Sequence, residues 1–124
     1  MVVMPPTYIL EISMQELYKN IEYHDSTLTN LITQGDVVKL DLENVLVDGR
    51  QRKVSIILHR VQKMEIEDQE VAEVSMEGED GVILTLDVNQ DSMELIVEWH
   101  NYSPHRSIVK HCRIECTSSS VEVL

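Results

Sequence analysis

Apolar and polar residues alternate along most of this 124-residue chain. The period is two, which puts apolar side chains on one face of an extended strand, whereas a helix needs them three and four residues apart. Turn signals interrupt the alternation every eight to fifteen residues, and Asp48-Gly49 is the strongest of them. We therefore predict a mainly β fold, either an antiparallel β-sandwich or a curved open barrel.

The expected strands are short alternating segments bounded by Gly, Pro, Asn, Asp or Ser. They cover residues 8–12, 28–33, 38–43, 54–59, 71–76, 82–88, 93–101, 106–117 and 121–124. One side of each strand is expected to be buried and the other wet, with Val82, Leu84, Leu86 and Val88 sharing a side. Ile57 and Ile83 break the alternation and indicate strands covered on both faces, or an interface. No repeat or linker divides the chain, so residues 1–124 are predicted to form a single domain.

One short helix is expected near the N-terminus. Ser13-Met-Gln-Glu16 has the form of a capping box, in which Ser13 and Glu16 satisfy each other's free backbone amides. A helix over residues 14–22 follows, with Leu17 and Ile21 on its inner face. The polar run His24-Asp25-Ser26 ends it.

Acidic residues are concentrated in one part of the chain. The 22 Asp and Glu exceed the 10 Lys and Arg by twelve, and residues 65–98 alone hold twelve acids and no Lys or Arg. This balance argues against binding to nucleic acid or to anionic lipid, which both need clustered cations. No apolar run approaches the roughly 18 residues of a membrane span, and no signal-peptide pattern is visible, so we predict a cytoplasmic protein without a membrane partner.

A concentrated negative surface speeds encounter with a cationic protein. We therefore predict a non-enzymatic interaction module for a basic partner protein, with an acidic face formed by Glu65, Glu67, Asp68, Glu70 and Glu73. The alternative is that this charge only keeps an aliphatic β-protein soluble and its strand edges apart.

Histidines suggest a second reading, in which the chain is a small-molecule or metal-binding β-domain. If residues 93–101 and 106–117 form a hairpin, His100 and His105 approach each other across its turn. Together with His24 and Asp25 they would supply a metal site or an acid–base pair. The same four residues are alternatively plain turn-forming residues.

No other pattern predicts a metal or a cofactor. Oxygen donors at Asp87, Asn89, Asp91 and Glu98 have the spacing of a calcium loop, but Ser92 stands where that loop needs glycine. We expect a hairpin turn there instead. Cys112 and Cys116 would lie ~13 Å apart in a strand, beyond the roughly 7 Å that a disulfide spans, so both thiols are predicted to be reduced.

Enzyme motifs are absent from the sequence. There is no nucleophile elbow, phosphate-binding loop or dinucleotide-binding motif, and His111 and Cys112 are strand neighbours that point to opposite faces. These features favour a protein that is not an enzyme, without deciding it. Homodimerisation through Ile57, Ile83 or Ile96 is a further possibility.

A resemblance rests on two short segments. Tyr23-His-Asp-Ser26 before an apolar strand, followed by Val38-Lys-Leu-Asp-Leu42, resembles small bacterial β-rich proteins of unknown function that share an aromatic-His-Asp-Ser stretch. The general pattern is also similar to immunity proteins of bacterial toxin systems. The resemblance implies a binder of a basic toxin and assigns no catalytic residue.

Overall fold

The computed structural model describes residues 20–124, in which ten strands form one antiparallel open sheet. The strands are β1 (Ile21–Glu22), β2 (Thr27–Gln34), β3 (Val37–Val47), β4 (Arg50–His59), β5 (Lys63–Ile66), β6 (Gln69–Val71), β7 (Asp80–Val88), β8 (Ser92–Tyr102), β9 (His105–Glu115) and β10 (Ser118–Val123). The mainly β, antiparallel prediction is confirmed. Within residues 20–124 no helix has the length and apolar character needed to cross a membrane.

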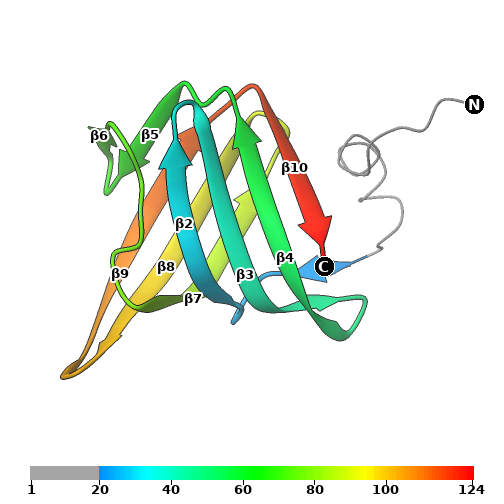
Figure 1. The fold of residues 1–124 in the computed structure, drawn as a ribbon, viewed down its shortest axis with the longest axis vertical. Coiled ribbons are helices and arrows are strands. Elements are labelled where there is room, and N and C mark those ends of the chain that lie inside the picture. Colours follow the sequence, from blue (N-terminus) through cyan, green and yellow to red (C-terminus); the bar gives the residue numbers. More distant parts are fainter. Residues whose placement is uncertain (1–19) are drawn as a thin grey trace, which may run out of the picture.

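The strand order divides the sheet into two halves. It runs β10-β4-β3-β2-β7-β8-β9-β5-β6, with β1 beside β3. We call β1–β4 with β10 the β2–β4 half, and β5–β9 the β5–β9 half. Figure 1 shows the sheet curling so that β2, β3, β4 and β10 lie in front of β7, β8 and β9. The chain crosses between the halves through two short links, residues 60–62 and residues 116–117.

The halves are joined along the sheet by a narrow junction between β2 and β7. Only two residue pairs connect these strands, Thr27 with Val82 and Leu28 with Gly81. A Cβ at Gly81 would lie 2.5 Å from Val97 Cγ1, so glycine is the residue that fits this crowded position. Beyond these two pairs, β2 and β7 do not pair with each other.

Aliphatic side chains from both halves fill the space enclosed by the curled sheet. The fully buried ones come from alternate positions of the long strands, as period-two patterning requires. They include Leu28, Val38, Leu40, Leu42, Val54, Ile56, Leu58, Ile83, Met93, Leu95 and Ile114. Trp99, the single tryptophan, is 3% exposed.

The predicted orientation of β7 is wrong at its centre. A bulge between Ile83 and Thr85 shifts the register against β8, and Ile83 is completely buried while Val82 and Leu84 are half-buried. A bulge adds one residue to one strand, so it reverses the sides of everything beyond it. Ile83 is therefore a core residue and is not available as an interface.

The predicted strand over residues 71–76 is also wrong. β6 ends at Val71 and pairs with β5 in a hairpin whose turn is Glu67-Asp68, with φ values of 51° and 63°. Residues 72–79 form no strand, yet Val74 is buried. Its backbone is satisfied by Thr33, whose Oγ1 accepts from Val74 N–H at 2.9 Å and donates to Val74 O at 2.7 Å.

Other local predictions hold. Asp48 and Gly49 have φ values of 49° and 82° and form the tight turn between β3 and β4. The β8–β9 hairpin and the last strand, β10, are both present. The predicted strand over 8–12 and most of the helix over 14–22 lie outside the described residues. At the predicted helix end, Ile21 and Glu22 pair with β3 as strand β1.

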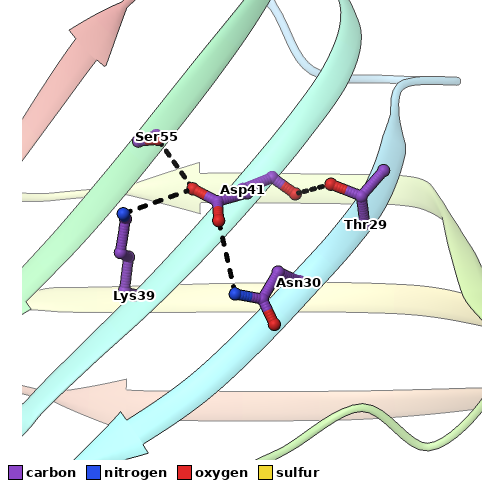
Figure 2. A network of polar contacts seen from close by, with 5 residues as sticks. All are labelled: Thr29, Asn30, Lys39, Asp41 and Ser55. Atoms are coloured by element: carbon purple, nitrogen blue, oxygen red, sulfur yellow. Dashed lines mark hydrogen bonds and ion pairs between the residues drawn. The ribbon is translucent and has the colours of Figure 1, made fainter.

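A polar network centred on Asp41 ties three strands of the β2–β4 half together on its outer face (Figure 2). Asp41 of β3 accepts hydrogen bonds from Ser55 Oγ at 2.7 Å and from Asn30 Nδ2 at 3.3 Å. Lys39 Nζ lies 3.9 Å from the same carboxylate, and Thr29 Oγ1 donates to Asp41 O at 3.2 Å. Ser55 is only 4% exposed, so these contacts meet its hydrogen-bonding need and fix the register of β2, β3 and β4.

Candidate functional site

Negative charge is segregated in the β5–β9 half. Residues 63–115 contain thirteen Asp or Glu against four Lys or Arg, a net charge of −9. None of the twelve carboxylates in residues 65–98 is buried, and eight of them are exposed. The sheet topology therefore keeps the acidic stretch together in one half of the molecule, and leaves the β2–β4 half with seven Asp or Glu against four Lys or Arg, a net charge of −3.

The five acids predicted as a binding face are not equivalent. Glu67, Asp68, Glu70 and Glu73 are exposed on the β5–β6 hairpin and the segment after it. The side chain of Glu65 is 22% exposed and lies 3.6 Å from Lys63 Nζ. Glu67 also has a structural contact, because its Oε1 accepts from His111 N–H at 2.8 Å. Four of the five thus form an accessible acidic rim.

β9 brings bases into the acidic half, which the sequence did not indicate. Lys110 Nζ lies 2.6 Å from Glu77 Oε1, and this carboxylate raises the pKa of Lys110. Arg113 stands opposite Glu94 of β8 on one side and Glu65 of β5 on the other. The strand order places β9 between β5 and β8, which both carry acids. The bases of β9 therefore neutralise only the carboxylates next to them, and the half keeps its negative charge.

The predicted approach of His100 and His105 is confirmed. His100 Nδ1 lies 3.2 Å from His105 Nε2, and His100 Nε2 lies 2.8 Å from Glu98 Oε1. The ring centroids are 5.4 Å apart and the ring planes are inclined by 18°, so the two imidazoles are nearly parallel. Glu98, His100 and His105 form a row, in which the His100 imidazole contacts the Glu98 carboxylate through one ring nitrogen and is hydrogen-bonded to His105 through the other.

Two further contacts anchor the hairpin next to this row. Tyr102 Oη donates to Asp80 Oδ1 at 2.7 Å, and Tyr102 N–H donates to Glu79 Oε2 at 2.7 Å. The hydrogen bond with Asp80 raises the pKa of Tyr102 above its usual value of 10.0. Asp80 begins β7 and Glu79 directly precedes it, so the acidic stretch itself holds the β8–β9 hairpin in place.

His24 and Asp25 lie elsewhere. His24 Nδ1 is 2.7 Å from Leu84 O, and Asp25 N–H donates to Ile83 O at 2.8 Å. His100 instead pairs with Asp80, which is four residues before Leu84 and about 13 Å away along β7. The four candidate residues are thus split into two pairs. Among the described residues no group of three or more His, Cys, Asp or Glu side chains is arranged to hold a metal ion.

The Tyr23-His-Asp-Ser26 segment has a clear local role as a turn. Asp25 has a φ of 65°, and Ser26, which is completely buried, donates from Oγ to Tyr23 O at 2.6 Å. Ser26 N–H donates to the same carbonyl at 3.0 Å. These are the side-chain and backbone hydrogen bonds that characterise a serine-stabilised turn.

We expect Ser26→Ala to lower the free energy of unfolding by about 1 kcal/mol, because a buried side-chain hydrogen bond is lost while the backbone bond remains. Urea denaturation followed by Trp99 fluorescence measures this loss. Thr29→Ala, which removes an exposed hydroxyl bonded at 3.2 Å, is the control and should cost less. Equal losses would contradict a special role for Ser26.

Both cysteines are free, as predicted, and both are buried. Burial, with a smaller contribution from Glu77, raises the pKa of Cys112 from 9.0 to about 12. Burial also raises the pKa of Cys116. His111 lies on the opposite face from Cys112 and contacts Glu94 Oε1 at 2.6 Å, so the histidine and the thiol do not form a nucleophile–base pair.

A shallow depression of about 350 Å³ lies on the outer face of the β2–β4 half. Its charged lining residues already form internal pairs: Lys39 with Asp41, and Lys53 with Glu43 at 3.5 Å. The depression has no surplus charge, and we assign it no ligand.

The β8–β9 hairpin carries the main exposed apolar surface of the β5–β9 half. Tyr102, Ile108 and Val109 are 55%, 53% and 50% exposed. Figure 1 shows the hairpin reaching beyond the neighbouring strands. Period-two patterning gave no sign of this, because Ile108 lies on the same side of β9 as the buried Cys112.

Comparison of the chain with protein-family models, with curated proteins and with solved structures found no match.

Proposed function

We propose that this protein is a non-enzymatic interaction module that binds a basic partner protein through its β5–β9 half, in the manner of an immunity protein. The observation that carries the proposal is the charge segregation: thirteen acids against four bases within residues 63–115. A field of one sign concentrated on one side steers a cationic partner to that side and repels acidic proteins.

Exposed apolar groups next to the carboxylates support the same proposal. Stable protein interfaces combine a desolvated apolar centre with a polar rim. Tyr102, Ile108 and Val109 supply apolar area on the β8–β9 hairpin, and Glu67 lies beside that hairpin, where its Oε1 accepts from His111 N–H. We also propose a cytoplasmic location, because two free cysteines suit a reducing compartment.

The test is affinity capture from a lysate of the source cells at low and moderate salt, followed by calorimetry with the purified partner. We expect one basic protein, bound less tightly as salt rises. The variant Glu67→Gln, Asp68→Asn, Glu70→Gln should slow association about tenfold, because it removes charge from the exposed rim. The amide oxygen introduced at position 67 can still accept from His111 N–H, so the hairpin should keep its structure.

The matched control removes three exposed charges from the other half, through Glu22→Gln, Asp25→Asn and Asp36→Asn. It should leave association within about twofold of the wild-type rate, because none of these three residues belongs to the β5–β6 hairpin or to the β8–β9 hairpin. An equal effect of the two triple variants, or capture of acidic proteins only, would contradict the proposal.

A further inference from the structure

β9 is paired on both sides for only part of its length. Its C-terminal part, residues 112–115, pairs with β5, and Glu67 continues that contact at His111. The N-terminal part, residues 105–110, pairs with β8 on one side, and no strand of the described chain pairs with it on the other. The turn at Glu67-Asp68 sends the chain away from β9 at this point. We call this unpaired side of residues 105–110, which continues the line of β5, the opening.

The register shows which backbone groups face this opening. His111 and Glu115 direct their carbonyls toward the β5 side, since they accept from Glu67 N–H at 2.9 Å and from Gln62 N–H at 2.8 Å. Backbone groups of alternate residues in an antiparallel strand point to the same side. Ser107 and Val109 lie four and two residues before His111 in β9. Their N–H and C=O groups therefore point to the same side as those of His111, into the opening.

Side chains along this edge are exposed on both faces of the strand. All residues from 105 to 109 are exposed, in contrast to the buried Cys112 and Ile114 farther along β9. Ile108 stands opposite the buried Trp99 at the rim of the core, and Val109 stands opposite Glu98 on the outer face. An exposed edge strand with apolar side chains is a template for pairing with another chain.

We infer that residues 105–110 of β9 are a strand-addition site, at which an extended segment of the basic partner pairs with Ser107 and Val109. Main-chain hydrogen bonds supply affinity in this mode of recognition, and alternate side chains supply specificity. Apolar side chains of the added strand pack on Ile108. Its Lys or Arg side chains lie on the outer face, toward Glu98, and at the end that meets Glu67 and Asp68. This inference rests on the proposed function and names how the partner is held.

Charge disfavours a second copy of this chain as the occupant. If two β9 edges paired antiparallel through Ser107 and Val109, Ile108 would face itself and Arg106 would face Lys110 of the other copy. Like charges directly opposite each other in a sheet are destabilising. Each copy also carries a net charge of −12, which opposes association. A basic segment whose Lys or Arg side chains lie on the outer face places none of them directly opposite Arg106 or Lys110, which share the other face with Ile108, and its positive charge is attracted by the net negative charge of this chain.

Val109→Pro tests the edge selectively. The Val109 N–H faces the opening and not β8, so proline removes no hydrogen bond inside the sheet, and proline is tolerated at such edge positions. Val109→Ala is the matched control, because it shortens the side chain and keeps the N–H. The probe is a labelled, end-blocked peptide in which Lys and Val alternate, with a Gly–Lys peptide of equal charge and a Glu–Val peptide as comparisons.

Fluorescence anisotropy measures the affinities. We expect the Lys–Val peptide to bind the wild type, and Val109→Pro to weaken it at least about tenfold, since a main-chain hydrogen bond is lost and the ring obstructs the added strand. Val109→Ala should stay within about threefold. Hydrogen exchange should show slower exchange at Ser107 and Val109 amides on adding peptide, which is a readout independent of any variant.

Three outcomes would overturn the inference: unchanged affinity in Val109→Pro, equal binding of the Gly–Lys peptide, or no binding of the Lys–Val peptide. Concentration-dependent dimerisation of the wild type, lost in Val109→Pro, would assign the edge to a second copy instead. Failure here is distinct from failure of the proposed function. A captured basic partner that is sensitive to the acidic triple variant and insensitive to Val109→Pro leaves the function standing without strand addition.

Discussion

Replacing Ile83 with alanine should lower the free energy of unfolding by about 2 to 5 kcal/mol, the cost of truncating a fully buried aliphatic side chain. Ile83 has no exposed surface, because the bulge in β7 turns it into the core. Urea denaturation followed by the fluorescence of the buried Trp99 measures the effect. The β-bulge, and not the alternation of the sequence, is the reason for this large value.

Ile96→Ala is the matched control for Ile83. Ile96 is half-buried on the neighbouring strand β8, on the outer face of the sheet. Ile96→Ala should lower the free energy of unfolding by only about 1 kcal/mol, because less apolar area is exposed to water than by Ile83→Ala. If the two variants lost equal stability, or if Ile83→Ala changed the oligomeric state and left the monomer as stable as before, the core assignment of Ile83 would be wrong.

Ionisation of Cys112 and Tyr23 should lower the free energy of unfolding by about 3 kcal/mol between pH 9 and pH 11, with about 2 kcal/mol due to Cys112 and about 1 kcal/mol due to Tyr23. Burial raises the pKa of Tyr23 from 10.0 to about 12, and burial with Glu77 raises the pKa of Cys112 from 9.0 to about 12. Both groups are neutral when protonated. The unfolded chain therefore releases these protons first as the pH rises, and each release favours unfolding.

Urea denaturation at a series of pH values tests this linkage. The stability contribution is complete well below pH 9 and disappears as the pH rises toward the raised pKa values near 12. Cys112→Ala is the control: its cavity lowers stability at every pH, but its decline from pH 9 to pH 11 should be about 2 kcal/mol smaller. A decline as steep as that of the wild type would show that Cys112 ionises normally in the folded protein.

Features that depend on neighbouring residues were predictable. Asp48-Gly49 forms its turn because glycine adopts a positive φ without strain and aspartate tolerates one. The β8–β9 hairpin needs no information from outside residues 92–115, so the approach of His100 to His105 followed from it. The free state of both cysteines likewise followed from the length of an extended strand.

Features that depend on distant residues were not predictable. The burial of Val74 relies on Thr33, 41 positions away, which replaces the strand partner that the predicted 71–76 strand would have needed. The bulge that buries Ile83 is fixed by pairing with β8 and by contact with the turn at Asp25. Neither partner can be read from the local alternation.

The candidate site shows the same division. The acidic segment could be found without a structure, because residues 65–98 hold twelve acids and no Lys or Arg and so account for the net charge of −12. The structure was needed to show that His24 and Asp25 lie apart from His100 and His105. His24 contacts β7 at Leu84, whereas His100 pairs with β7 at Asp80. The exposed edge of β9 depended on where β5 stops pairing with it.

Alternation and turn residues thus determined that this chain is an antiparallel β-protein with an aliphatic core and one acidic segment, because side-chain direction in a strand is set by local geometry. The order of the strands decided the rest. It placed the bases of β9 among the acids, buried Ile83, and left residues 105–110 without a partner strand on one side within the described chain. Strand order arises from the burial of side chains that are far apart in sequence, and period-two patterning carries no record of which strand lies beside which.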